Sequence, residues 1–412
     1  MQRFDISRRR LLAAPLAAAL VPDAASAWAA AAAGGPKRLV VIMLRGAVDG
    51  LSVVVPYGED AYYEARRSIA IGRPGTSGGV LPLDGHFGLH PALAGLMPLW
   101  AAGALAFVHA AGSPDPTRSH FDAQRYIESG TPGRDATADG WMNRLLQALP
   151  GRRSPTDAVA VGPILPRILS GAAPAANLAL GPNAARPLPI DRPEVGGAFD
   201  RLYDADDALG RAYREGRSAR AELLAGLAAE ARAADNGALP TTGFPGQAAR
   251  LARLIARDPS IRLAFVALGG WDSHVEQGNA TGPLANRLRA LGDGIAALAQ
   301  GLGSAWADSA VVVISEFGRT VRENGDGGTD HGHGNAIWVA GGGIKGGRVY
   351  GEWPGLSPER LYQRRDLAVT TDFRTAIGVV VDRHLRLPDS RLAGVFPGAP
   401  AATPALTAMV PA

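Results

Sequence analysis

Acidic, imidazole and hydroxyl side chains gather in glycine-containing segments that border apolar runs. The run LVVIML is followed by RGAVDG, LAFVAL by GGWDSH and AVVVIS by EFGRT, whereas TDHGHGN precedes AIWVA. Oxygen ligands suit hard divalent cations, and zinc, manganese and iron also accept imidazole nitrogen. These segments therefore predict a metal site without cysteine. The candidate metal ligands are Asp49, Asp272, His274, Glu316, Asp330, His331 and His333.

Each of these residues also has a structural interpretation. An Asp-Gly pair such as that at Asp49 is a common turn, and Asp272 and His274 can hydrogen-bond to one another within a loop. Glu316 ends an apolar run, where a buried carboxylate needs a partner that could be Arg319 instead of a metal ion. Imidazole–carboxylate bonds could likewise stabilise the DHGH segment. The sequence alone does not decide between the metal-binding and the structural interpretation of these residues.

A hydroxyl nucleophile is available in the segment PTRSH, where a loop enters a helix expected over 119–129. A hydroxyl at a helix N-terminus faces an anion-binding position, and Arg118 adds a bidentate donor. A metal ion could lower the pKa of that hydroxyl and make it a nucleophile. Ser119 could instead be only the N-cap of the helix, and the sequence does not distinguish it from Thr117 as nucleophile. The candidate catalytic residues are Thr117, Arg118, Ser119 and His120.

The elements that would position these segments alternate along the chain. Short apolar, β-branched runs suit strands covered on both faces, and the longer segments between them have helical spacing. This alternation predicts an α/β fold with a mostly parallel central sheet, in which ligands bind beyond the carboxyl ends of the strands. Strands are expected over 39–44, 105–109, 158–161, 263–268, 310–315 and 336–340, and helices over 91–102, 119–129, 140–149, 284–302 and 372–385.

The sequence predicts one domain with an insertion. Residues 37–397 are expected to form the domain, with an Ala-, Arg- and Glu-rich helical insertion at about 198–258. A crossover between strands needs only one helix of ordinary length, so these additional residues are expected to form a helical insertion or cap. The Pro- and Ala-rich residues after Leu387, including the C-terminal tail 398–412, are expected to lie across the surface or to be loose.

The composition is that of a globular protein. The 412 residues include 42 basic and 38 acidic side chains, a net charge of +4 and 47% hydrophobic residues, which excludes wholesale disorder. Cysteine is absent, which excludes disulfides, a cysteine nucleophile and iron–sulfur clusters. The charge is small for this length and no dense basic run follows the first ten residues, so no nucleic-acid partner is expected.

Residues 1–27 have the features of an export signal. A basic region ending in SRRRLL precedes an apolar stretch over 11–21 that is too short to span a bilayer, and ASA then fits a cleavage site. Arg8-Arg9 before this weakly hydrophobic stretch resembles a twin-arginine signal, with an ordinary secretory signal as the alternative. We therefore expect a periplasmic or otherwise exported protein that uses the twin-arginine machinery and has no membrane span once the signal is removed.

Eight segments of the chain carry a resemblance to a known family. They cover essentially the whole of residues 37–397 and several are long and unusual. Through them the chain resembles the twin-arginine-exported proteins of the domain of unknown function 1501 family, within the alkaline phosphatase-like superfamily. The segments are LVVIMLRGAVDGL, HFGLHPAL, GSPDPTRSHFDAQ, GGWDSH, VVVISEFGRT, GTDHGHGN, GGGIKGGRVYG and DLAVTTDFR.

The resemblance implies a three-layer αβα sandwich and metal-assisted hydrolysis or transfer of phosphate, sulfate or related esters. It implies that Asp49 matches the superfamily's aspartate after the first strand. A nucleophile that opens a helix would be Thr117 or Ser119. The superfamily's last histidine, which precedes a strand and a glycine-rich turn, would be His331 or His333.

Two positions depart from the superfamily pattern. Asp272 and His274 match an aspartate and histidine after a later strand but stand closer together than usual. An Asp-His-Gly segment is expected after the next strand, and Glu316-Phe317-Gly318 stands there instead. The expected metal site is therefore an altered one, either a single-metal site or a site adapted to another task.

Three functions follow from these observations. The first is an exported hydrolase of phosphate, sulfate or related esters that uses a divalent metal, which could be zinc, manganese, calcium or magnesium, and acts on a small anionic ester. The alternative is a non-catalytic periplasmic binding or assembly protein on the same scaffold. A redox cofactor carrier is suggested only by the export signal, because no cofactor motif accompanies it.

Overall fold

The apolar runs form a nine-stranded sheet within the described residues of the computed structural model, which are 35–134, 137–151, 154–162, 165–178, 197–198, 201–202 and 243–411. The export signal 1–27 and most of the insertion at about 198–258 lie outside these residues. The strands of the sheet are β1 (Arg38–Leu44), β5 (Leu105–Gly112), β6 (Ala158–Val161), β7 (Ala176–Leu178), β8 (Leu263–Leu268), β9 (Ser309–Ser315), β10 (Asn335–Gly341), β11 (Arg348–Tyr350) and β12 (Thr371–Asp372).

The sheet is mostly parallel, as the alternation predicts. Its order is β11-β5-β10-β9-β1-β8-β6-β7, and β12 pairs with β5. β1 runs parallel to both β8 and β9, whereas β10 is antiparallel to both β5 and β9. All six strands expected from the sequence are present.

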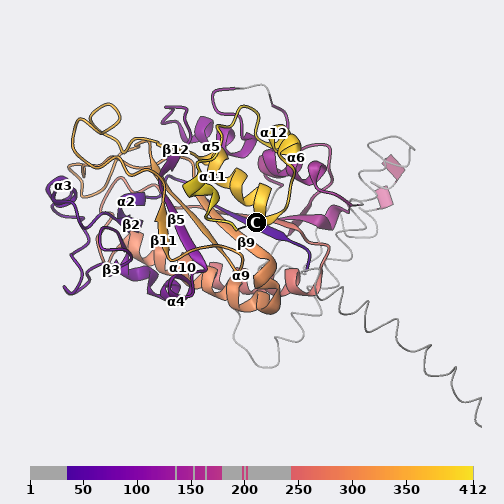
Figure 1. Ribbon diagram of the computed structural model, residues 1–412, viewed down its shortest axis with the longest axis horizontal. Helices are drawn as coiled ribbons and strands as arrows, with labels where there is room; N and C mark the ends of the chain where they lie inside the picture. Colours follow the sequence, from indigo (N-terminus) through magenta and orange to yellow (C-terminus); the bar gives the residue numbers. More distant parts are fainter. Residues whose placement is uncertain are drawn as a thin grey trace, which may run out of the picture. The chain divides into compact units, whose positions relative to one another are not determined.

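Helices cover both faces of the sheet, which confirms the three-layer αβα architecture. Side chains alternate across β1: Val40, Ile42 and Leu44 belong to one buried cluster, and the intervening residues belong to another on the opposite face. In Figure 1, α4, α9 and α10 lie on one side of the sheet and α5, α6, α11 and α12 on the other. The bounds are α4 (Met97–Ala101), α5 (His120–Ser129), α6 (Trp141–Ala148), α9 (Phe244–Arg257), α10 (Pro283–Leu302), α11 (Phe373–Val379) and α12 (Asp389–Val395).

Two expected helices are divided. The segment expected as a helix over 91–102 forms the 3-10 helix η1 (Pro91–Leu96) followed by α4, whose second residue is Pro98. Proline lacks the N–H that a continuous helix needs, which explains the break. The segment expected over 372–385 forms α11 and then one π-helical stretch, Val380–His384.

The C-terminal residues lie across the surface and are anchored by a few buried side chains, so the expectation of a loose tail is wrong. They form α12 and a short helix α13 (Pro404–Thr407). Phe396, Met409 and Val410 are each at most 2% exposed and belong to the same buried cluster as one face of β1. The Pro- and Ala-rich composition hides these few apolar anchors, because burial depends on where a side chain points and not on the average of its neighbourhood.

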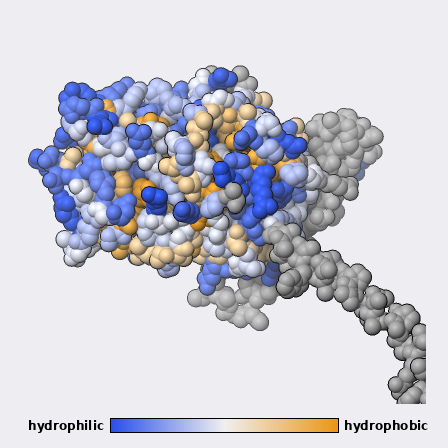
Figure 2. Space-filling model, in the orientation of Figure 1, coloured by the Kyte–Doolittle hydropathy of each residue, from blue (hydrophilic) through white to orange (hydrophobic). Residues whose placement is uncertain are grey.

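The polar segments leave the sheet at one edge. In the register of the sheet, Leu44 at the end of β1 lies beside Leu268 and Ser315 at the ends of β8 and β9. RGAVDG, GGWDSH and EFGRT therefore start side by side. Because β10 is antiparallel, its first residue Asn335 pairs with Ala111 near the end of β5, and the preceding TDHGHGN segment reaches the same edge. The end of the molecule that carries α2 (Gly50–Val53) and α3 (Asp60–Ala65), just after β1, is largely hydrophilic in Figure 2.

Within the described part of the chain, no helix combines the length and the apolar character needed to cross a membrane.

Candidate metal centre

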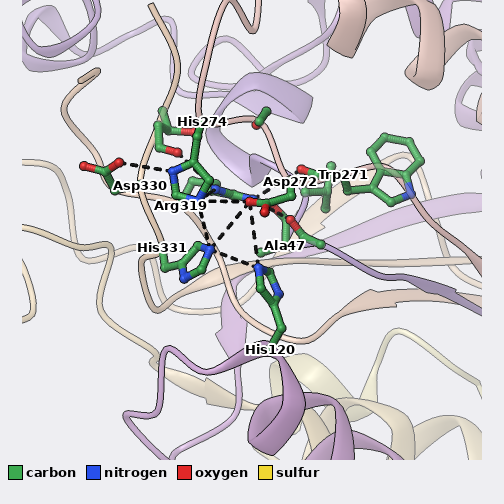
Figure 3. Close-up of polar contacts among 12 residues, drawn as sticks. Ala47, His120, Trp271, Asp272, His274, Arg319, Asp330 and His331 are labelled. Atoms are coloured by element: carbon green, nitrogen blue, oxygen red, sulfur yellow. Dashed lines mark hydrogen bonds and ion pairs between the residues drawn. The ribbon is translucent and has the colours of Figure 1, made fainter. Parts of the chain in front are cut away.

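Three imidazole nitrogens and one carboxylate oxygen converge at this edge (Figure 3). We call His120, Asp272, His274 and His331 the histidine–aspartate cluster. The Nε2 atom of His331 lies 2.9 Å from that of His120 and 3.0 Å from that of His274. The Oδ1 atom of Asp272 lies 3.1 Å from His274 Nε2, 3.5 Å from His331 Nε2 and 3.8 Å from His120 Nε2. Two loops, one after β8 and one before β10, and the first residue of α5 supply these groups.

The other ring nitrogen of each histidine faces an oxygen acceptor. A backbone carbonyl or an ionised carboxylate cannot donate, so each Nδ1 must carry the hydrogen. In the neutral ring, Nε2 is then left with a lone pair that points into the cluster. The Nδ1 contacts are 2.8 Å from His120 to Glu316 Oε1, 3.2 Å from His274 to Asp330 Oδ1, and 2.9 Å from His331 to the carbonyl oxygen of Arg118.

The cluster therefore presents four acceptors to one another at close range. In the described residues, the hydrogen-bond donor that reaches them is Arg319, whose Nη2 lies 2.5 Å from Asp272 Oδ1 and whose Nη1 lies 3.5 Å from His274 Nε2. Lone pairs facing each other at 2.9–3.0 Å need a cation between them, either a shared proton or a metal ion. Ligand atoms of His120, Asp272 and His331 all lie within 4.8 Å of one another, as binding of one shared ion requires, and His274 Nε2 adjoins them beside His331. A donor set of imidazoles and a carboxylate suits zinc, manganese or iron better than calcium or magnesium.

Arg319 fixes the loops that carry the cluster. Its side chain is 0% exposed and donates to the carbonyl oxygens of Gly46 (2.5 Å), Ala47 (2.7 Å) and Thr329 (3.0 Å). Burial raises the pKa of Asp272, but the hydrogen bond and charge of Arg319 outweigh it, so the pKa of Asp272 is lowered. A guanidinium enclosed in this way is a positioning group and is not accessible to an anionic substrate.

Glu316 is the partner of His120 and not of Arg319. Its side chain is 0% exposed, and its Oε1 accepts from His120 Nδ1 (2.8 Å), Gln124 Nε2 (2.9 Å) and the Gly46 backbone N–H (2.8 Å). Burial raises the pKa of Glu316, but these donors outweigh it and lower the pKa. The hydrogen bond between Glu316 and His120 also raises the pKa of His120. These contacts give Glu316 the position of a carboxylate behind a histidine ligand.

Gln124 is a site residue that the sequence analysis missed. It lies four residues after His120 on α5, so both side chains point to the same face of that helix. Its position four residues after His120 could have indicated Gln124 as a site residue, since the helix was expected from the sequence.

Asp49 does not join the cluster. Its carboxylate is fully buried and accepts from Arg66 Nη1 (2.5 Å) and Nη2 (3.0 Å), from Ser52 Oγ (2.6 Å) and from Gln277 Nε2 (2.7 Å). The guanidinium of Arg66 therefore already supplies the cation for this carboxylate. We therefore do not propose Asp49 as a metal ligand. The sequence could not show that Arg66 lies beside this carboxylate in the folded protein.

His333 also lies apart from the cluster. Its ring packs at 4.6 Å from the ring of Tyr362, and burial lowers its pKa. In the DHGH segment, His331 faces the cluster and Asp330 supports His274 from outside. Residues two apart in an extended strand would point to the same side, so the path of this loop, and not a strand pattern, decides that His331 and not His333 faces the cluster.

The hydroxyls of the PTRSH segment have local partners. Ser119 Oγ caps α5 by accepting from the Asp122 N–H at 3.4 Å, and Thr117 Oγ1 accepts from the Ser119 N–H at 3.2 Å. Neither hydroxyl is within hydrogen-bonding distance of the histidine–aspartate cluster in the described residues. The structural alternative for Ser119, an N-cap, is therefore present.

Arg118 reaches the cluster through its backbone. Its carbonyl oxygen holds His331, while its Nη2 donates to Asp366 Oδ2 at 2.7 Å and to Gln363 Oε1 at 2.8 Å. Asp366 is fully buried and also accepts from Arg365 Nε at 2.8 Å. The sequence analysis did not single out Asp366, although it begins the segment DLAVTTDFR that contributes to the family resemblance.

Comparisons with known proteins find one family model and several distant structures. Residues 100–396 match the profile of the family described as Protein of unknown function (DUF1501). No curated protein matches the sequence. Solved structures that resemble the fold include the zinc complex of the C-terminal periplasmic domain of EptC from Escherichia coli (TM-score 0.34, 11% identity, covering 75% of this chain and 73% of that one).

Two further structures show a similar degree of likeness. They are the lipoteichoic acid synthase LtaP from Listeria monocytogenes (TM-score 0.32, 9% identity, 92% and 77% coverage) and an alkaline phosphatase superfamily protein from Vibrio parahaemolyticus (TM-score 0.31, 11% identity, 77% and 63% coverage). At such TM-scores these similarities assign no substrate or cofactor to this chain.

Proposed function

Since the chain belongs to the DUF1501 family, whose description names no activity, the site itself must carry the argument, and we propose that the protein is a metal-dependent hydrolase of phosphate, sulfate or related esters. The observation that carries the proposal is the convergence of three Nε2 lone pairs and the Asp272 carboxylate, with each Nδ1 hydrogen held by an acceptor. This is the arrangement that a histidine-rich metal site requires.

A divalent cation held by His120, Asp272, His274 and His331 would polarise an ester oxygen and lower the pKa of a water molecule to near neutrality. When His120 and His274 are neutral, Glu316 and Asp330 hold their hydrogens on Nδ1, which leaves each Nε2 lone pair free to bind the cation. Arg319 fixes Asp272 and offsets its negative charge.

The exposure of the cluster indicates how a substrate can reach it, and the positions of the nearby hydroxyls indicate which nucleophile is available. The four side chains are between 25% and 48% exposed, so an ester can approach the cluster from solvent. The nucleophile that we propose is water, because neither Thr117 nor Ser119 reaches the cluster.

Phe317 supports a single-cation site. Its ring lies 4.9 Å from that of His120 and 5.1 Å from that of His331, and it is 3% exposed. An aromatic ring offers no ligand atom and covers one side of these imidazoles. Together with the pairing of Asp49 to Arg66, this makes one cation, and not two, the stoichiometry that we propose.

The test is metal content followed by hydrolysis. The mature protein, purified without a histidine tag, should contain about one equivalent of zinc, manganese or iron by inductively coupled plasma mass spectrometry. The Asp272→Ala/His331→Ala variant should lose this metal, whereas Asp49→Asn and His333→Gln should retain it. Hydrolysis of a panel of phosphate and sulfate monoesters and diesters should then depend on the metal.

The outcomes separate the two candidate functions. Bound metal without hydrolysis of any ester would favour the non-catalytic binding or assembly protein. Absence of metal after reconstitution, or equal metal in wild type and the double variant, would overturn the proposed site.

We also propose export by the twin-arginine pathway to the periplasm. Arg8-Arg9, the short apolar stretch and the small-residue cleavage pattern support it. Cell fractionation should find the mature chain in the periplasm, with accumulation of the precursor in a strain lacking the twin-arginine translocase. Unchanged export in that strain would indicate the ordinary secretory pathway.

A further inference from the structure

A cavity of about 590 Å³ lies beside the histidine–aspartate cluster and has no role in the site described above. Its walls come from α5, from the end of β8, from the residue that follows β1, and from the described residues after β6, which are 162 and 165–167. The residues that line the cavity include Arg45, Phe121, Gln124, Glu128, Arg167 and Phe265.

The cavity and the cluster share a wall. Gln124 lines the cavity and donates at 2.9 Å to Glu316, the carboxylate that holds His120. Phe121, which immediately follows His120 on α5, also lines it. On another wall, Arg45 precedes Gly46, whose N–H donates to the same Glu316 oxygen at 2.8 Å. None of the four cluster residues lines the cavity, so a molecule with its ester at the cluster would reach the cavity past the exposed side chain of Phe121, which follows His120 on α5.

The cavity has an excess of positive charge. Arg45 pairs with the one carboxylate of the lining, Glu128, at 2.5 Å. Arg167 also lines the cavity, and its Nη2 donates to the carbonyl oxygen of Thr137, a neutral acceptor. No carboxylate lies within ion-pair distance of Arg167 in the described residues. The Nε–H groups of both Arg45 and Arg167 are likewise without an acceptor there.

An exposed aromatic ring borders this charge. Phe121 is 76% exposed, and the other ring of the lining, Phe265, belongs to β8. A large apolar side chain left in solvent beside a cavity offers a stacking surface for a ring. Arginine presents several donors in a fixed plane that fits carboxylate, sulfate or phosphate. The lining thus combines a ring surface with an anion-binding guanidinium.

We propose that this cavity binds the remainder of the substrate, and that the preferred substrate is a ring-bearing ester with a second anionic group, which Arg167 recognises. The inference rests on the proposed ester hydrolase function, since the first anionic group is the ester held at the histidine–aspartate cluster. It adds a substrate class that the cluster alone does not define.

The test compares matched esters and matched variants. Phenyl phosphate and 4-carboxyphenyl phosphate, or the corresponding sulfates, differ by one carboxylate. Wild type should have a higher kcat/KM for the carboxylated ester, and Arg167→Gln should reduce this preference roughly tenfold or more, the usual contribution of a hydrogen bond between charged groups. Arg360→Gln, which removes the same charge from an exposed position, should leave the preference unchanged.

Binding of the phosphonates that correspond to these esters, measured by calorimetry, separates this inference from the proposed function. Tighter binding of the carboxylated phosphonate that Arg167→Gln abolishes, without hydrolysis of any ester, would support the cavity and overturn the hydrolase. Hydrolysis with no preference for the second charge, or the same effect from Arg167→Gln and Arg360→Gln, would overturn the cavity proposal and leave the hydrolase standing. Failure of both phosphonates to bind would also overturn the cavity proposal.

Discussion

Replacing Arg66 with methionine tests why Asp49 lies outside the metal centre. Both side chains of this pair are 0% exposed, and Arg66 supplies two of the donors that reach the carboxylate. Arg66→Met leaves Asp49 buried with only Ser52 and Gln277 as donors. Breaking a buried ion pair by removing one partner costs about 3–5 kcal/mol, because an uncompensated charge remains.

The expected fall in melting temperature follows from the size of the folded unit. Unfolding entropy is about 2.1 cal/mol/K per residue, which gives roughly 0.8 kcal/mol/K for the unit from Lys37 to Ala412. A loss of 3–5 kcal/mol therefore corresponds to a fall of about 4–6 °C. Thermal unfolding followed by circular dichroism measures this fall.

The loss should also depend on pH. In the wild type, burial raises the pKa of Asp49 but Arg66 outweighs it, so the pKa lies below its usual value and the pair stabilises the fold above that range. In Arg66→Met, only the hydrogen bonds from Ser52 and Gln277 still oppose burial, which is the largest influence on this pKa, so we expect the pKa of Asp49 to rise. The folded variant is then penalised at neutral pH and relieved once Asp49 is protonated. The gap between wild type and variant should therefore narrow as the pH falls from 7 toward about 4.

Two further variants complete the test. Asp49→Asn/Arg66→Met removes both charges and should recover most of the lost stability, and Arg67→Met, at the exposed neighbouring position, should have little effect. A fall in melting temperature equal to that of Arg67→Met, or a double variant as unstable as the single one, would refute the argument that a buried charge pair occupies this position.

Three other predictions concern acid, the loop at β1 and the C-terminus. Burial lowers the pKa of His109 and His384 to about 4, below the unfolded value near 6.5, so stability should fall as the pH drops through this range, by roughly 2 kcal/mol for each histidine at pH 5. Urea unfolding should show a smaller loss in His384→Gln, and equal acid sensitivity would contradict this. Gly46 has a φ of +114°, and a Cβ there would lie 2.6 Å from the backbone nitrogen of Asp272. Gly46→Ala should therefore displace the loop that carries Asp272 and reduce the metal content of the protein. A full metal complement in this variant would contradict the close approach. Deleting residues 399–412 should destabilise the domain by roughly 5 kcal/mol, because the buried side chains of Leu406, Met409 and Val410 are lost. An unchanged urea midpoint would show that the tail is not part of the core.

The composition and periodicity of the chain determine the layers. Runs such as LVVIML and AVVVIS can be buried on both faces only inside a sheet covered by helices. The six expected strands and three of the five expected helices are present with small shifts of their ends. The same pattern places the polar segments at strand ends, so their meeting at one edge could be expected.

The composition of the site depended on tertiary contacts. Asp49 and Glu316 follow strands in equivalent ways, yet one is neutralised by Arg66 and the other supports His120. His331 and His333 are two residues apart, and only the path of the loop decides which of them faces the cluster.

The sequence by itself thus determined which elements form and which kinds of side chain lie at the edge of the sheet, because these follow from local periodicity. The tertiary structure alone decided which acceptor each imidazole nitrogen faces and which carboxylates already have a cation. The physical reason is that hydrogen bonds and ion pairs act over a few ångströms between residues far apart in the chain, and local sequence carries no record of those distances.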